Sequence, residues 1–174
     1  MKSRLVSWRG AVLGAALAGI ALPAGAATGP ADPILRLPLY PSIAADKRVC
    51  AQRTASGLGY TALRAGQGSP PPAGAVALIN YIGYLAADGQ TFDQAMGAPM
   101  EVDGVIPGFA EGLKLMTKGA IFRLCVPAPL AYGAAAQGPI PPNSALVFQV
   151  EMLEFKTAAE IEAMRAAQAT KPQP

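Results

Sequence analysis

The sequence predicts an α+β fold in which a single antiparallel sheet wraps over one short helix. Two observations on local pattern support this, and a third indicates a functional loop. Segments rich in β-forming residues alternate with turns that contain glycine or proline. Between them, residues 104–119 show the apolar spacing of a short helix. Residues 130–145 form a glycine- and proline-rich stretch too long for a tight turn, and such loops in compact domains are commonly functional. One helix covered by one sheet is an α+β arrangement.

The clearest strand signal is residues 75–85 (AVALINYIGYL), which are rich in β-forming side chains. Asp88-Gly89 follows and favours a hairpin, with the return strand beginning at Thr91. Further strands are predicted at residues 54–63 (an edge strand entering a turn), 100–105 (a brief extended stretch), 121–126 and 146–155.

The helix is predicted to begin at Pro107, whose fixed φ suits the first helical position and whose missing N–H would be unpaired there anyway. Phe109, Leu113 and Met116 recur at helical spacing, so one face should point into a core. Gly119 can serve as the left-handed stop. A helix this short is unstable alone in water, so the sheet must pack on it.

The first 26 residues have the features of a secretory signal peptide. Lys2, Arg4 and Arg9 precede a short apolar run, and Ala24-Gly25-Ala26 is an A-x-A cleavage site. Cleavage after Ala26 predicts an exported protein without a stable membrane anchor; an uncleaved anchor in the inner membrane is the alternative. Cleavage leaves 11 Lys and Arg against 11 Asp and Glu, so the basic pI gives no indication of nucleic-acid binding.

The rest of the chain divides into three parts. Residues 27–53 alternate prolines with apolar residues without a helical period, which predicts an extended arm or linker. Residues 54–156 form the folded domain. Residues 157–174 form a tail, with an amphipathic helix at 158–169 and a disordered end.

The two cysteines, Cys50 and Cys125, favour a disulfide because an even pair in an exported protein meets an oxidising compartment. Phe122, Leu124 and Val126 share one face of their strand, so Cys125 points to the other face and can meet a segment lying across the outside of the sheet. Two free thiols are the alternative. Without histidine, two cysteines make a metal site unexpected.

The absence of histidine also excludes Ser–His–Asp triads and histidine acid–base catalysis. No nucleophile elbow or phosphate-binding loop occurs. A loose G-x-G-x-x-A at residues 57–62 lacks a preceding apolar strand, so it does not indicate nucleotide binding. The remaining candidates are a few polar groups (Tyr81, Asp93, Tyr132 and Arg123) among apolar and aromatic residues (Phe92, Met100, Val102, Val105, Ile106, Phe109, Ile140 and Phe148).

A mostly apolar site with a few placed hydroxyl groups suits a reaction that breaks no covalent bond, such as rotation about an X–Pro peptide bond. The barrier of about 18–20 kcal/mol comes from amide resonance. The twisted transition state has lost that resonance, so a preshaped apolar cavity can favour it over the planar ground states. Neither a general base nor a cofactor is required.

A series of short motifs runs in order along residues 54–155: Ile79-Asn80-Tyr81-Ile82-Gly83, Asp88-Gly89, Thr91-Phe92-Asp93, Val105-Ile106-Pro107-Gly108-Phe109-Ala110-Glu111-Gly112-Leu113, Ala131-Tyr132-Gly133, Ile140-Pro141-Pro142-Asn143-Ser144-Ala145-Leu146-Val147-Phe148 and Val150-Glu151. In this order and near these spacings they resemble the FKBP-type peptidyl-prolyl cis-trans isomerases.

The resemblance implies an antiparallel sheet of five or six strands curved around one helix, with a proline pocket between them. It implies Phe109 at the pocket floor and an aromatic wall from Tyr81, Phe92 and Phe148, and it gives the backbone N–H of Ile106 the role of binding a substrate carbonyl. The implied catalytic residues are Tyr81, Asp93 and Tyr132, with the lining completed by Met100, Val105, Ile106 and Ile140.

Without the resemblance, the same residues have ordinary interpretations. Phe109, Phe148 and Ile106 would be core residues, Asp93 a turn or cap residue, and Tyr132 a loop tyrosine. The chain also departs from the family, which usually has tryptophan at the floor.

Phe109 at that position predicts a larger pocket without an indole donor. We expect this change to reduce the affinity for macrolide inhibitors more than it reduces the isomerisation rate. The stretch at residues 133–139 is also about one residue short of the commonest family loop.

The resulting hypothesis is a periplasmic isomerase that acts on proline-containing unfolded or nascent polypeptides of the cell envelope. The alternative is a binding or chaperone module that holds proline segments without catalysis.

Overall fold

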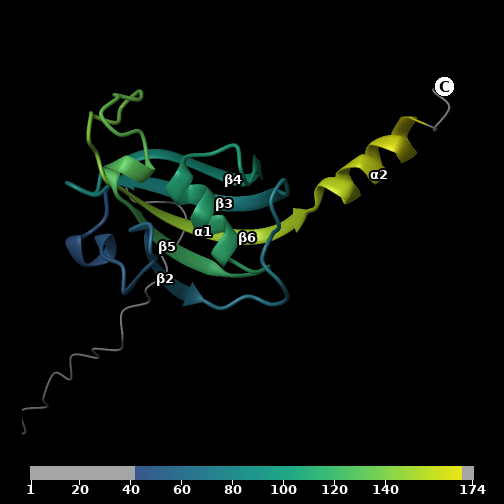
Figure 1. Ribbon diagram of the computed structural model, residues 1–174. Coiled ribbons are helices and arrows are strands. Elements are labelled where there is room, and N and C mark those ends of the chain that lie inside the picture. Colours follow the sequence, from purple (N-terminus) through teal and green to yellow (C-terminus); the bar gives the residue numbers. More distant parts are fainter. Residues whose placement is uncertain (1–41, 170–174) are drawn as a thin grey trace, which may run out of the picture. The chain divides into compact units, whose positions relative to one another are not determined.

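A computed structural model describes residues 42–169; the predicted signal peptide, residues 27–41 of the predicted arm and the last five residues lie outside this range. Six strands form one antiparallel sheet in the order β1-β2-β5-β6-β3-β4, and helix α1 (Pro107–Leu115) lies against one of its faces (Figure 1). The strands are β1 (Gln52–Arg53), β2 (Gly59–Arg64), β3 (Val76–Leu85), β4 (Thr91–Glu101), β5 (Ile121–Val126) and β6 (Leu146–Lys156). The predicted α+β fold is confirmed.

The main core lies between α1 and the sheet. Phe109, Leu113 and Met116 are buried there. They meet the inward side chains of β5 (Phe122, Leu124 and Val126) and of β6 (Phe148, Val150 and Met152). Gly112 permits the close approach of α1 to β5, because a Cβ at this position would lie 2.4 Å from Leu124 Cδ1. The alternation of buried side chains along the strands therefore fixes which face the helix covers.

Helix α1 ends earlier than the sequence predicts. It stops at Leu115, and the Met116 N–H donates to the Leu113 carbonyl before the backbone becomes extended. Gly119 is left-handed (φ +80°), but it lies in the following turn, where its N–H donates to the Met152 carbonyl. The prediction that Gly119 stops the helix is wrong, because this glycine shapes the entry into β5 instead.

Two strand predictions also need correction. Strand β2 is not an edge strand, since β1 pairs with it on the outside through Gln52↔Tyr60 and Arg53↔Gly59. Beyond Glu101 the chain turns rather than remaining extended, with the Gly104 N–H donating to the Glu101 carbonyl. The turn after β4 places residues 104–106 directly before α1.

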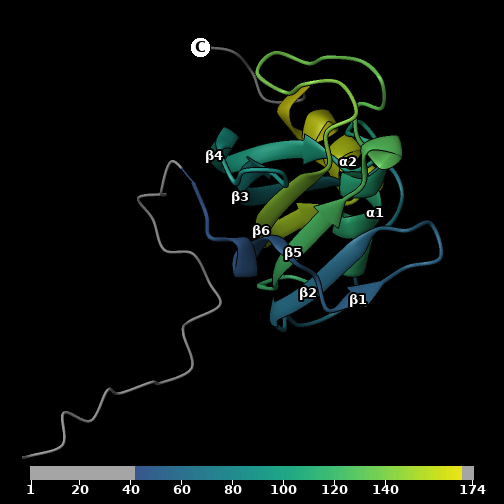
Figure 2. The same ribbon diagram turned by 90° about the vertical axis from the view of Figure 1, so that its left-hand side faces the viewer.

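Residues 42–51, here called the N-terminal clasp, cover part of the outer face of the sheet, the face opposite α1, before the chain enters β1 (Figure 2). They contain the short 3-10 helix η1 (Ala45–Arg48), so this part of the arm is not a plain linker. Ile43 is buried with Ile82, Tyr84 and Val147 in a second apolar cluster.

Polar and covalent bonds fasten the clasp. A disulfide joins Cys50 to Cys125 on β5. The Arg48 guanidinium donates to the carbonyls of Ala86 and Ala87 at 3.1 and 2.7 Å. Arg123, buried beneath the clasp, donates to the Val49 carbonyl at 3.2 Å, and desolvation lowers the pKa of its guanidinium. The clasp therefore shields apolar side chains of the outer face, and Arg123, from solvent.

Tyr84 is 1% exposed in the second cluster, and among the described residues no group accepts a hydrogen bond from its hydroxyl. Burial raises the pKa of Tyr84 to about 12. Between about pH 10 and 12 the folded protein keeps this proton while the unfolded chain loses it, so the free energy of unfolding should fall by about 2–3 kcal/mol as the pH rises.

Tyr84→Phe should lose this extra alkaline decline and should be at least as stable as the native chain at pH 8, because it removes an unpaired buried hydroxyl. Urea unfolding of both proteins from pH 8 to 12 tests this. An identical pH dependence in the two proteins would contradict it.

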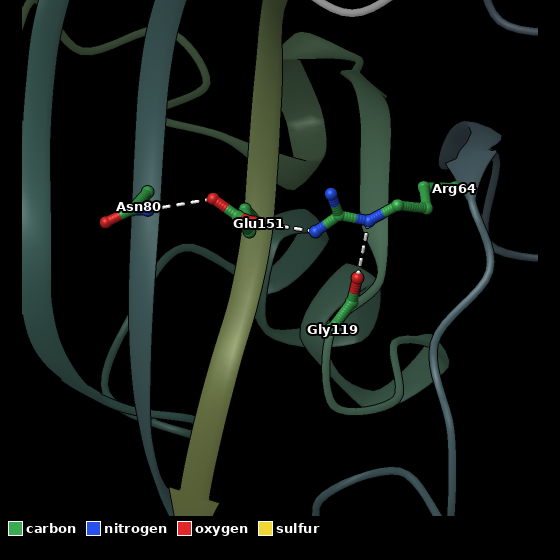
Figure 3. A network of polar contacts seen from close by, with 4 residues as sticks. All are labelled: Arg64, Asn80, Gly119 and Glu151. Carbon is green, nitrogen blue, oxygen red and sulfur yellow. Dashed lines mark hydrogen bonds and ion pairs between the residues drawn. The ribbon is translucent and has the colours of Figure 1, made fainter.

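A row of polar contacts crosses the outer face beside the clasp (Figure 3). The Glu151 carboxylate on β6 accepts from Asn80 Nδ2 at 2.8 Å and from Arg64 Nη2 at 2.7 Å. Arg64 Nε donates to the Gly119 carbonyl at 2.9 Å, and Asn80 Oδ1 accepts from the Gly97 N–H at 2.8 Å. This chain of bonds ties β4, β3, β6 and β2 together through side chains.

Helix α2 (Ala158–Ala169) follows β6 directly and agrees with the predicted tail helix. Its start is a reciprocal cap: Thr157 N–H donates to Glu160 Oε2 at 2.7 Å, and Glu160 N–H donates to Thr157 Oγ1 at 3.2 Å. The bonds from Thr157 lower the pKa of the Glu160 carboxyl. Within residues 42–169, the helices are all too short or too polar to cross a bilayer.

Candidate functional site

A cavity of about 290 Å³ opens where β3, β4, α1 and β6 meet. Nine of the ten sequence-predicted site residues line it: Tyr81, Phe92, Asp93, Met100, Val105, Ile106, Phe109, Tyr132 and Phe148, joined by Gly104. They come from three strands, the turn after β4, the first turn of α1 and the loop after β5. Residues up to 67 positions apart in the sequence are thus brought to one place by the sheet order.

The floor and wall of the cavity are aromatic. Phe109 is 3% exposed, and its ring centre lies 4.8 Å from that of Phe148 and 6.0 Å from that of Tyr81. The rings of Phe92 and Phe148 are 5.5 Å apart with an interplanar angle of 88°. These edge-to-face contacts lock the rings against one another, so the wall is preformed rather than assembled around a ligand.

Gly83 on β3 makes room for this wall. A Cβ at Gly83 would lie 2.5 Å from Phe92 Cζ and 2.9 Å from Phe148 Cε1. Because real Cβ atoms do not approach ring atoms this closely, both rings would have to move if any other residue stood here. Gly83 therefore determines the position of two lining side chains without lining the cavity itself.

The polar side of the cavity is a tyrosine–carboxylate pair. Tyr81 Oη donates to Asp93 Oδ2 at 2.7 Å, and Asp93 Oδ1 accepts from the Gln94 N–H at 2.8 Å. Burial, the hydrogen bond and the charge of Asp93 raise the pKa of Tyr81 far above its ordinary value, with a smaller contribution from Tyr132. Tyr81 therefore remains a protonated donor at any physiological pH, and it holds the carboxylate in one orientation at the cavity edge.

Two donors at the cavity have no hydrogen-bond partner among the described residues: the Ile106 N–H and the Tyr132 hydroxyl. The Ile106 carbonyl, in contrast, accepts from the N–H groups of Phe109 and Ala110 and starts α1. Pro107 has no N–H, so Ile106 offers the last backbone donor before the helix. These two groups are free to bind carbonyl oxygens of a ligand.

Ile140, the tenth predicted residue, does not line the cavity. It is 4% exposed and packs in the main core, and it exchanges two backbone hydrogen bonds with Gln137 across a tight turn. That turn draws the side chain inward. Sequence reasoning also missed Gly104 as a lining residue, because a glycine carries no side chain by which to recognise it.

Within residues 42–169 no three histidine, cysteine, aspartate or glutamate side chains gather in a way that could hold a metal ion. The cavity is lined by apolar walls, one fixed carboxylate and a few hydrogen-bond donors. Such a site can bind and reshape a ligand.

The family model described as FKBP-type peptidyl-prolyl cis-trans isomerase matches residues 67–153. The chain belongs to this family. It is 43% identical over 120 residues to the FKBP-type peptidyl-prolyl cis-trans isomerase FkpA of Escherichia coli strain K12, a match that covers 67% of the chain and 44% of that relative. It is 40% identical over 109 residues to the outer membrane protein MIP of Legionella longbeachae, covering 60% of the chain and 46% of the relative.

Solved structures of FKBP-type relatives have the same fold. The crystal structure of FkpA from Escherichia coli matches with a TM-score of 0.59 and 41% identity, covering 62% of this chain and 52% of that one. A peptidyl-prolyl cis-trans isomerase from Pseudomonas syringae pv. tomato matches with a TM-score of 0.56 and 35% identity, covering 61% and 80%. The matches to these two curated relatives cover less than half of the relatives' own length.

Proposed function

We propose that this FKBP-type protein accelerates cis–trans rotation about X–Pro bonds in unfolded or nascent polypeptides. The observation that carries the proposal is the cavity itself, in which an aromatic floor, a fixed Tyr81–Asp93 pair and two unpartnered donors meet. Family membership supports the same activity.

In the proposed mechanism the prolyl ring rests against Phe109 while the Ile106 N–H and the Tyr132 hydroxyl hold substrate carbonyls. Rotation disrupts amide resonance, so the twisted amide is less polar than the planar one and suits an apolar cavity better. Asp93, oriented by Tyr81, lies beside the rotating group. All of these contacts are non-covalent, and rate acceleration comes from binding the twisted amide more tightly than either planar form.

We further propose that the protein acts in the periplasm on envelope polypeptides. The support is the predicted signal peptide and the match to a relative named an outer membrane protein. Macrolides would occupy the same cavity, and they would bind weakly because Phe109 offers no indole N–H. A binding module without catalysis would fill the cavity without accelerating exchange, so the same assay separates the two functions.

The double variant Asp93→Ala with Tyr132→Phe should lower kcat/KM for a proline tetrapeptide by about 10- to 100-fold, because it removes the carboxylate and one donor from the cavity. NMR exchange measurements on the peptide give this rate. Gln94→Ala is the matched control, since Gln94 is exposed on the same strand and does not line the cavity. Unchanged exchange in the folded double variant would rule out the assigned roles.

A further inference from the structure

A second hollow, of about 320 Å³ and here called the groove, adjoins the cavity described above, here called the proline cavity. Its walls come from the turn before β3 (Gly74), the end of β4 (Glu101), the turn after β4 (Gly104) and the first turns of α2 (Ala158, Ile161 and Glu162). Gly104 lines both hollows, so they adjoin at a residue without a side chain. A chain bound in one can continue into the other across this glycine.

Helix α2 forms one wall of this groove without being part of the core. None of its side chains is buried, Ile161 is only half-buried, and Met164 is 45% exposed. Ile161 lines the groove, and it also lines a neighbouring hollow together with Met164. A helix of 12 residues is marginally stable alone, yet these apolar side chains face open hollows instead of the core. The arrangement leaves apolar surface next to the proline cavity for a ligand to cover.

We propose that the groove between α2 and the turn after β4 is an extended subsite for the polypeptide whose prolyl residue occupies the cavity. This inference rests on the proposed function. Val76 and Ile161 supply apolar contacts, while the carboxylates of Glu101 and Glu162 can accept backbone N–H groups of an extended chain. Asp103 forms an ion pair with Lys114 and accepts a hydrogen bond from the Gly74 N–H, so it stabilises the groove wall instead of binding the peptide.

The length of the groove sets the length of peptide that reaches it. From Ala158 to Arg165 a helix rises about 10 Å, which matches about three residues of extended chain. A tetrapeptide centred on the cavity is then too short to fill the groove, whereas a peptide with five residues on each side of the proline extends into it. Substrates should therefore be distinguished by length as well as by the residue before proline.

The test uses the isotope-labelled chain without residues 1–26. It is titrated with a blocked proline tetrapeptide and with an eleven-residue peptide that has five residues on each side of a central proline. Both peptides should shift the amide signals of Ile106 and Phe109, and only the longer one should shift those of Gly74, Ala158 and Glu162. The longer peptide should bind at least five times more tightly. Equal shifts at the groove from both peptides, or none from either, would overturn the subsite.

Two matched variants sharpen the test. Ala158→Phe places a ring in the groove, and Ala159→Phe places the same ring one position on, at a residue that does not line it. Ala158→Phe should abolish the affinity advantage of the longer peptide and leave the tetrapeptide unaffected, whereas Ala159→Phe should change neither. Loss of the advantage in both variants would refute the subsite. Groove shifts without faster X–Pro exchange would support the subsite while contradicting the proposed isomerase activity.

Discussion

Replacing Phe109 with alanine is expected to remove most of the proposed isomerase activity and to lower stability by about 3–5 kcal/mol. The ring is 3% exposed, forms the cavity floor and contacts the rings of Tyr81 and Phe148 edge to face. Its removal leaves a void that the preformed wall cannot fill, because the other rings are held by their own contacts. The prolyl ring would then lose the surface against which the twisted amide is held.

Stability and activity must be separated for this variant. Phe109→Leu is the matched control, since it keeps an apolar floor and most of the buried volume and should cost less stability than alanine. Its activity should fall between those of the native chain and Phe109→Ala. Urea unfolding reports the stability, and X–Pro exchange at a urea concentration where all three proteins are folded reports the activity. A folded alanine variant with native exchange rates would show that Phe109 is only a core residue.

Replacing both cysteines with serine is expected to lower the free energy of unfolding by about 4 kcal/mol. The bridge between Cys50 and Cys125 spans a sequence separation of 75 residues, and loops of this size give about that loss of chain entropy in the unfolded state. The clasp would keep only its polar contacts and the burial of Ile43. Because the clasp lies on the face opposite α1, the folded variant should retain its isomerase rate.

Denaturant unfolding of the double serine variant and of the native chain, each with and without a reducing agent, tests this expectation. Reduction should destabilise the native chain to the level of the variant and leave the variant unchanged. Equal stability of the two oxidised proteins would contradict the contribution assigned to the bridge. A large loss of isomerase rate in the folded variant would instead show that the clasp supports the cavity.

The sequence predicted the parts of the fold that depend on local pattern. Pro107 marks the start of α1 because a fixed φ and a missing N–H have the same consequence in every fold. The alternation in β5 and β6 predicts the buried face because side chains alternate strictly along a strand. The end of α1 was predicted less well, since Gly119 is required by the turn into β5, which depends on tertiary contacts with Met152.

The lining of the cavity could be predicted from the family motifs because these residues stand in matching order along the chain. Ile140 and Gly104 mark where this reasoning stops. Whether a loop residue faces a cavity or the core depends on a turn such as that between Gln137 and Ile140, which residue type alone does not reveal. The clasp was predicted only in part. A segment across the outside of the sheet was expected from the position of Cys125, whereas the packing of Ile43 on that face is a long-range contact that no local pattern reveals.

Gly83 bears on any attempt to transplant this cavity. Because Gly83 has no Cβ, the rings of Phe92 and Phe148 have the space that they occupy. Part of the binding surface therefore depends on a residue that does not itself line the cavity. Grafting the lining side chains onto another antiparallel sheet would reproduce the chemistry of the wall but not its depth, unless the glycine were grafted too. A comparison of candidate isomerases by lining residues alone would therefore accept sequences in which the aromatic rings cannot take these positions.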